Sequence, residues 1–152
     1  MSIKRITNPE EFCQVIDDLH SLFHMENVNQ SHFFLPASPE SIKLAFGHTV
    51  ILAWDFFVWA SKTNGKFDAA IMFFNDKNVK FGKKIFSEYA WVSKNPHAGY
   101  KLLQTAIKFA RQMEFEIMMM GTMVNHPKHE KIKSFYNKMG FLKDSETYIC
   151  KL

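Results

Sequence analysis

Three strand-like stretches follow one another in the middle of the chain, and they constrain its fold more than any other sequence feature. Residues 49–60, 67–74 and 84–92 are rich in the β-branched and aromatic residues that favour strands. Asn64-Gly65 separates the first two stretches, and this dipeptide is typical of a tight β-hairpin. Residues 75–78 (Asn-Asp-Lys-Asn) predict a second turn. We therefore expect three consecutive antiparallel strands.

Two helices are predicted ahead of these strands, after a short first strand over residues 3–6. Asn8-Pro9 predicts the start of the first helix, because Asn caps helix N-termini and proline suits the first turn. Apolar residues then recur at helical spacing over residues 12–23. Ser38-Pro39 predicts the start of the second helix, which Gly47 is expected to end.

A strand-helix-strand unit is predicted after the antiparallel strands. Residues 93–99 form a loop, and a helix with one apolar stripe is expected to begin near Tyr100. The apolar stretch 115–120 is short, as in a buried parallel strand. Such a crossover is right-handed and leaves its two strands parallel.

A last helix around residues 132–139 and a last strand over residues 148–152 complete the expected order, β-α-α-β-β-β-α-β-α-β. This order predicts an α/β (α+β) fold with a mixed, mostly antiparallel central sheet and helices on both faces. The length of 152 residues suits one core, so we expect a single domain over residues 1–152.

Composition excludes several classes of protein. Hydrophobic residues make up 47% of the chain, too many for a disordered one. The most apolar run, residues 50–60, is broken by Asp55 and is shorter than the about 20 residues of a membrane-spanning helix. The net charge of +4 is scattered, so nucleic acid is not an expected partner. Two distant cysteines, Cys13 and Cys150, and a start without an apolar stretch favour a cytoplasmic protein.

The loop before the third predicted helix has the chemistry of an anion site. The first turn of a helix presents unpaired backbone N–H groups, and the helix dipole favours negative charge there. Gly99 would let the backbone approach a ligand closely, and Lys94 would add a positive charge. The alternative is that Gly99 serves only the turn and the start of the helix.

Two parts of the sequence resemble the GNAT acyl-CoA N-acyltransferases. Residues 88–92 (EYAWV) and 99–103 (GYKLL) are similar to the central motif of that family. Asn125 and residues 134–141 (SFYNKMGF) resemble its next motif, an Asn followed by Tyr-x-Lys/Arg-x-Gly-Phe. The resemblance implies the GNAT fold, whose element order matches the one predicted above.

The loop departs from the family pattern, which usually reads Gln/Arg-x-x-Gly-x-Gly/Ala. Lys94 stands at the first position and His97 at the middle glycine, so only Gly99 matches well. Divergent viral members of the superfamily look similar here, and a viral origin would make the location the host cytoplasm.

The resemblance implies a set of residues that bind acetyl-CoA as cosubstrate. These are Trp91, Val92, Lys94, His97, Ala98, Gly99, Tyr100 and Asn125. The backbone of Trp91 and Val92 would pair with the pantetheine arm where the sheet splays. The amides of residues 97–100 would bind the pyrophosphate. Asn125 would cap the last helix or touch the pantetheine.

The resemblance also implies two catalytic residues. Glu88 would act as a base on the amine through water, although a strand carboxylate can equally be solvated or ion-paired. Tyr136 would protonate the leaving thiolate, although it lies on an apolar stripe and can equally be core. The histidine pairs His20/His24 and His126/His129 lack further ligands, so no metal is expected.

The predicted function is therefore an acetyl-CoA-dependent N-acetyltransferase that moves the acetyl group directly to a primary amine. The amine belongs to a small molecule, a peptide N-terminus or a lysine side chain. The protein is expected to be a monomer or a homodimer. The alternative is a catalytically degenerate CoA-binding or protein-interaction module on the same fold.

Overall fold

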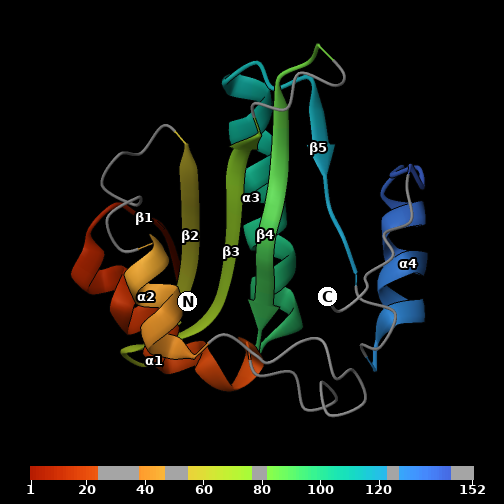
Figure 1. Ribbon diagram of the computed structural model, residues 1–152. Coiled ribbons are helices and arrows are strands. Elements are labelled where there is room, and N and C mark those ends of the chain that lie inside the picture. Colours follow the sequence, from red (N-terminus) through yellow and green to blue (C-terminus); the bar gives the residue numbers. More distant parts are fainter. Residues whose placement is uncertain (24–37, 47–54, 77–81, 123–126, 145–152) are drawn as a thin grey trace, which may run out of the picture. The chain divides into compact units, whose positions relative to one another are not determined.

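The computed structural model describes residues 1–23, 38–46, 55–76, 82–122 and 127–144 (Figure 1). Its elements are β1 (Ser2–Ile6), α1 (Pro9–Phe23), α2 (Pro39–Phe46), β2 (Phe56–Thr63), β3 (Lys66–Asp76), β4 (Ile85–Ser93), α3 (Pro96–Gln112), β5 (Ile117–Met119) and α4 (His129–Lys138). The chain divides into two compact units, one with β1–β5 and α1–α3 and one with α4. The single domain expected over residues 1–152 stays a prediction.

The first unit is built on one sheet with the strand order β1-β2-β3-β4-β5. β1 to β4 pair antiparallel with their neighbours, and β4 and β5 pair parallel. The hairpin between β2 and β3 turns at Asn64 and Gly65, whose φ angles are 52° and 80°. Both central residues of a type I′ turn need positive φ, which is why Asn-Gly predicts it. The mixed, mostly antiparallel sheet is thus confirmed.

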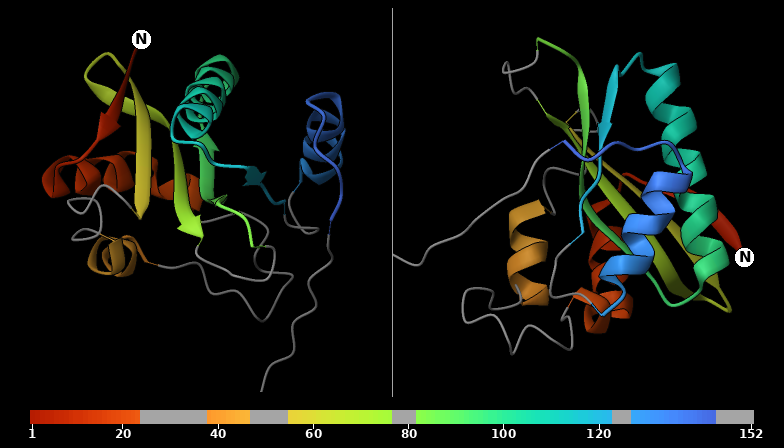
Figure 2. Two further views of the ribbon diagram at one scale, coloured as in Figure 1. Left: turned by 90° about the horizontal axis from the view of Figure 1, so that it is seen from above. Right: turned by 90° about the vertical axis from the view of Figure 1, so that its right-hand side faces the viewer.

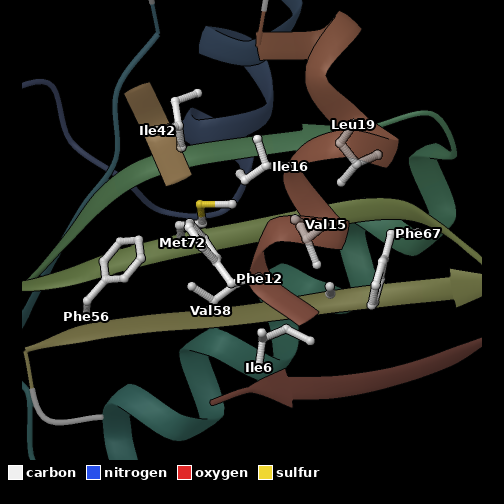
Figure 3. Packing of buried hydrophobic residues seen from close by; sticks show 12 residues of the cluster. Ile6, Phe12, Val15, Ile16, Leu19, Ile42, Phe56, Val58, Phe67 and Met72 are labelled. Atoms are coloured by element: carbon white, nitrogen blue, oxygen red, sulfur yellow. The ribbon is translucent and has the colours of Figure 1, made fainter. Parts of the chain in front are cut away.

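Helices cover both faces of this sheet, as predicted (Figure 2). α1 and α2 pack on one face, where their apolar side chains meet those of β1, β2 and β3 (Figure 3). α3 covers the other face, where Phe109 lies against Phe57 and Phe86. Phe86 also stacks on Phe73, with 4.2 Å between the ring centroids. The abundant phenylalanines therefore fill two cores, one on each side of the sheet.

The first two helices begin where the sequence predicts. The side-chain oxygen of Asn8 accepts a hydrogen bond from the backbone N–H of Glu10 at 2.8 Å. Ser38 Oγ accepts one from the backbone N–H of Ser41 at 3.1 Å. In both helices a proline follows the cap as the first helical residue. Proline lacks the N–H group that would be unbonded at this position. A capping side chain followed by proline therefore leaves few backbone N–H groups of the first turn without a partner.

Two strand predictions differ from the structure. β5 has only three residues and is half-buried, whereas residues 115–120 were predicted to form a buried strand. Phe115 lies ahead of β5 and does not pair in the sheet; its ring packs against that of Phe86. Asp55 lies in a bend directly before β2. Residues 49–54 and the last strand, predicted over residues 148–152, lie outside the described residues.

None of the helices in the described ranges combines the length and the apolar character needed to cross a membrane.

The first core can be tested with one substitution made at two positions. Leu19 in α1 is fully buried, whereas Leu44 in α2 is 81% exposed. Leu19→Ala should lower the free energy of unfolding by about 3–5 kcal/mol, because it removes buried methyl groups and leaves a cavity. Leu44→Ala should change it by less than about 0.5 kcal/mol. Chemical denaturation measures both, and equal effects would contradict the described packing of α1.

Candidate active site at the end of β4

β4 has a partner strand along one edge but only a short one along the other. β3 pairs with β4 from Ile85 to Ser93. β5 pairs with it over three residues, the last pair being Ser87 with Met119. Beyond Ser87 this edge of β4 has no strand beside it in the part of the chain that the structure describes. Among the described residues β4 and β5 thus part after Ser87. Trp91 and Val92 lie beyond this point, and their role in cosubstrate binding stays a prediction.

A β-bulge lies where the divergence begins. The register pairs Met72 with Ala90 and Phe73 with Glu88, so Tyr89 is the extra residue on β4. Side chains of paired residues project to the same face of a sheet. Glu88 therefore shares the face of Phe73, which α3 covers. The ring of Tyr89 contacts that of Phe46 in α2, on the opposite face.

Gly99 lies inside α3 and is buried. A Cβ atom added to it would lie 3.0 Å from Ser93 Cβ and 3.4 Å from Trp91 Nε1. The indole N–H of Trp91 donates a hydrogen bond to the Gly99 carbonyl at 3.2 Å. The close approach that requires glycine is thus between α3 and β4. Neither role that we expected for Gly99, ligand approach or turn, includes this contact.

α3 begins at Pro96, one turn earlier than the start predicted near Tyr100. Asn95 is its cap, and Asn95 Oδ1 accepts hydrogen bonds from the backbone N–H groups of His97 at 3.0 Å and Ala98 at 3.5 Å. The Gly99 N–H donates to the Asn95 carbonyl at 3.0 Å. Tyr100 lies a turn inside the helix, where N–H groups bond to carbonyls four residues earlier. The donors expected for the pyrophosphate are therefore bonded within the chain.

Asn95 is a site residue that our sequence reasoning missed, although a signal for it exists. Asn95-Pro96 repeats the pattern of Asn8-Pro9, which correctly predicts the start of α1. The position of Gly99 suggested that the loop continues to that glycine. The cap pattern was the better guide, because it provides for the unbonded donors of the first turn.

Lys94 does not point to the start of α3. Its ammonium group donates a hydrogen bond to the backbone carbonyl of Asp18 in α1 at 2.7 Å, and its backbone N–H donates to the Asp68 carbonyl at 2.8 Å. α1 covers the face of the sheet opposite α3. The geometry therefore does not support the predicted role of Lys94 as a positive charge beside an anion at α3.

Tyr136 lies in the second unit and is buried, with 8% of its surface exposed. Its hydroxyl group donates a hydrogen bond to the Gly121 carbonyl at 2.9 Å. Its ring is 5.4 Å from that of Phe141. The ring of Tyr136 thus lies in an apolar environment, and its hydroxyl proton is used in a hydrogen bond. Its catalytic role stays a prediction. Asn125 lies outside the described residues, and Lys128 stands at the start of α4 without a side-chain cap.

Two of the described histidines, His20 and His129, have protein partners. His20 Nδ1 lies 3.0 Å from the Asp17 carbonyl oxygen, and His129 Nδ1 lies 3.3 Å from Thr122 Oγ1. Over residues 1–23, 38–46, 55–76, 82–122 and 127–144, no three His, Cys, Asp or Glu side chains gather as a metal-ion site would require. His24 and His126 lie outside these ranges.

The cap at the start of α3 gives a stability prediction. Asn95→Ala should lower the free energy of unfolding by about 1 kcal/mol, because two backbone N–H groups lose their acceptor. Asn95→Asp keeps an oxygen at that position and adds a charge that the helix dipole favours, so it should leave stability unchanged or higher. Thermal and denaturant unfolding compare the variants. Equal stability of the Ala and Asp variants would show that the cap contributes nothing.

Comparison with known proteins gives matches in structure only. No protein-family model and no curated protein matches the sequence. The fold is similar to that of AAC(6')-Iy in complex with the bisubstrate analogue CoA-S-monomethyl-acetylneamine, with a TM-score of 0.69, 11% identity and coverage of 99% of this chain and 97% of that chain.

Two further solved structures are similar. An aminoglycoside acetyltransferase, meta-AAC0020, from an uncultured soil metagenomic sample, in complex with sisomicin, has a TM-score of 0.68 and 14% identity over 99% of this chain and 95% of that chain. Ribosomal-protein-alanine N-acetyltransferase from Brucella melitensis biovar Abortus 2308 has a TM-score of 0.66 and 8% identity over 100% of both chains. Such low identities establish the fold alone. The chain has the fold of the GNAT acetyltransferases.

Proposed function

We propose that the protein is an acetyl-CoA-dependent N-acetyltransferase that transfers the acetyl group directly to a primary amine. One observation carries the proposal: in the described part of the chain β5 pairs with β4 only as far as Ser87, whereas β4 continues to Ser93. The fold supports it, because the similar structures include acetyltransferases and one complex with a CoA-containing bisubstrate analogue. Two cysteines, far apart in the sequence, support a cytoplasmic location.

The open edge of β4 suits the pantetheine arm of acetyl-CoA. This arm contains two amide groups, and an exposed strand edge offers N–H and C=O groups to an added extended chain. The backbone N–H of Lys94 bonds to the Asp68 carbonyl of β3, and every second residue of a strand turns its backbone groups to the same edge, so those of Val92 face β3 as well. Of the two predicted residues, Trp91 would therefore provide groups at the other edge. The bound thioester supplies an activated acetyl group. In the transfer a bond forms between the amine nitrogen and the acetyl carbon, and the carbon–sulfur bond breaks.

The pyrophosphate fits less well at the start of α3. The amides of His97 and Ala98 are bonded to the side chain of Asn95, so an anion could bind them only after that side chain moves away. The exchange replaces a neutral acceptor by a charged one, and charged acceptors form the stronger hydrogen bonds. We therefore propose that the Asn95 side chain competes with the pyrophosphate for the amides of His97 and Ala98.

Glu88 and Tyr136 are the proposed proton carriers. An alkylammonium group has a pKa near about 10, so at neutral pH it must lose a proton before it can attack. Glu88 is half-buried and follows the last residue of β4 that pairs with β5, which supports its role as the base acting through water. Tyr136 would give its hydroxyl proton to the leaving thiolate, which then departs as a thiol.

A degenerate CoA-binding or interaction module remains a second candidate function. The observation that favours it is the completed cap at the start of α3, since an efficient pyrophosphate site would present free amides. The acetyl acceptor differs among the similar proteins, as their names state. Our proposed acceptor is a primary amine on a small molecule, a peptide N-terminus or a lysine.

Ligand-induced stabilisation separates the two parts of the proposed cosubstrate site. Acetyl-CoA and S-acetylpantetheine, which lacks the diphosphate, should both raise Tm, because ligand at about 100 times its Kd stabilises the native state by about 2.7 kcal/mol. Asn95→Gly should lower the Kd for acetyl-CoA and leave that for S-acetylpantetheine unchanged, since it frees two amides at little cost in stability.

Thermal shift and calorimetric titration measure these constants. A Tm that neither ligand raises would contradict acyl-CoA binding on β4. An unchanged Kd for acetyl-CoA in the Asn95→Gly variant would show that the pyrophosphate does not use these amides.

The role of Glu88 predicts a pH dependence. Glu88→Gln should lower kcat with a primary amine by about 100-fold near pH 7, the lower end of the usual contribution of a general base. The defect should shrink as the pH rises towards about 10, because a growing share of the amine is then neutral without help. Thiol release followed across this pH range measures it.

Tyr136→Phe is the matched variant for this experiment. It removes a proton donor to the thiolate, and its loss of kcat should not shrink towards high pH in the way expected for Glu88→Gln. It also loses the hydrogen bond to Gly121, so the free energy of unfolding should fall by about 1 kcal/mol. A Glu88→Gln defect that is the same at pH 7 and at pH 10 would exclude Glu88 as the base.

A further inference from the structure

Four aromatic rings gather on the face of the sheet covered by α1 and α2. They come from four elements: Phe46 from α2, Phe56 from β2, Phe74 from β3 and Tyr89 from β4. The centroid of the Tyr89 ring lies 4.6 Å from that of Phe46, 5.5 Å from that of Phe74 and 6.1 Å from that of Phe56. We call this group the aromatic platform.

The platform becomes more exposed towards Tyr89. Phe56 is 2% exposed, Phe46 and Phe74 are half-buried, and Tyr89 is 37% exposed. The hydroxyl group of Tyr89 has no hydrogen-bond partner among the residues that the structure describes. Burial raises the pKa of Tyr89, so its hydroxyl stays neutral at physiological pH. The platform therefore presents an uncharged aromatic face with one free polar group.

The platform lies next to the proposed reaction centre. Tyr89 is the bulged residue of β4, two positions beyond the last pair with β5. A pantetheine arm that starts near α3 and runs along β4 past Trp91 would bring its thioester end to this point of the strand. Bulges occur often beside active sites, where they redirect one side chain. The bulge here directs Tyr89 to the face opposite α3.

We propose that the aromatic platform binds the apolar part of the acceptor, and that the acceptors are primary amines carrying an aromatic group. This inference rests on the proposed acetyl transfer. Stacking on Tyr89 would bury an acceptor ring against a surface already backed by three rings, and aromatic pairs add stabilisation beyond the buried area. A polyhydroxylated amine leaves its hydroxyl groups without partners on such a surface, which disfavours its binding.

The test compares two amines at saturating acetyl-CoA by the rate of thiol release. 2-Phenylethylamine should have a kcat/KM at least about tenfold above that of ethanolamine, which offers the same primary amine without a ring. Tyr89→Ala should lower kcat/KM for 2-phenylethylamine by about tenfold, which corresponds to about 1.4 kcal/mol, and leave that for ethanolamine unchanged. Tyr89→Phe keeps the ring and should keep most of the preference.

Two further variants control for structural damage. Leu44→Ala alters an exposed apolar residue of α2 two positions before Phe46, hence about 200° away around the helix, and should leave both rates unchanged. Tyr89→Leu keeps apolar bulk in contact with the three phenylalanines and removes the aromatic face. It should therefore keep the Tm of the parent and lose the preference for 2-phenylethylamine.

The outcomes separate this inference from the proposed function. If acetyl-CoA does not raise Tm and no amine releases thiol, the acetyl transfer itself is wrong. If ethanolamine reacts as well as 2-phenylethylamine, or if Tyr89→Leu keeps the preference, the transfer stands and the aromatic platform is not the acceptor site.

Discussion

The rest of the first unit depends on the unequal pairing of β4. β3 pairs with one edge of this strand from Ile85 to Ser93, with the bulge at Tyr89 on the way. β5 holds the other edge over three residues only. The crossover helix has to connect the far end of β4 with the start of β5, and it therefore begins where the edge is open. In the described part of the chain the start of α3 and the stretch of β4 beyond β5 therefore lie at the same end of the strand.

The three helices of the first unit begin by the same means. Each has a capping side chain, from Asn8, Ser38 or Asn95, followed directly by a proline. The cap and the proline together leave few free N–H groups at a helix start. In α1 and α2 this only stabilises the helix. In α3 the cap would also compete with the pyrophosphate of the proposed cosubstrate, so stability and the proposed binding would make opposite demands on Asn95.

Local signals explain why most of the fold could be predicted from the sequence. The turn at Asn64-Gly65 depends only on the φ angles of these two residues, and the helix start at Asn8-Pro9 depends only on the first turn of that helix. The face of the sheet to which each side chain projects does not follow from such local signals. The bulge at Tyr89 depends on the register between β3 and β4, which no pattern within β4 reveals. A prediction that simply alternates side chains between the two faces of the sheet therefore assigns the wrong face to the residues on one side of the bulge.

The candidate site was harder to predict for the same reason. Family resemblance led us to Glu88, Trp91 and Gly99, but the contact between Trp91 and Gly99 depends on how α3 packs on β4. Lys94 bonds to Asp18, a residue 76 positions earlier, and no local pattern announces that contact. Gly99 fits against Ser93 because a helix and a strand approach each other, which sequence spacing does not express. The residue types were predictable, whereas their partners were not.

The bulge also sets what kinds of change this strand can absorb during evolution. Exchange of the residue at position 89 alters one side chain and leaves the strand as it is. Loss of that residue would close the bulge and leave the other faces as they are, because Glu88 already pairs with Phe73 and Ala90 with Met72, which are neighbours in β3. The indole of Trp91 would still reach Gly99. The bulge is therefore a place in β4 where the chain can shorten without moving the side chains on either side of it to another face.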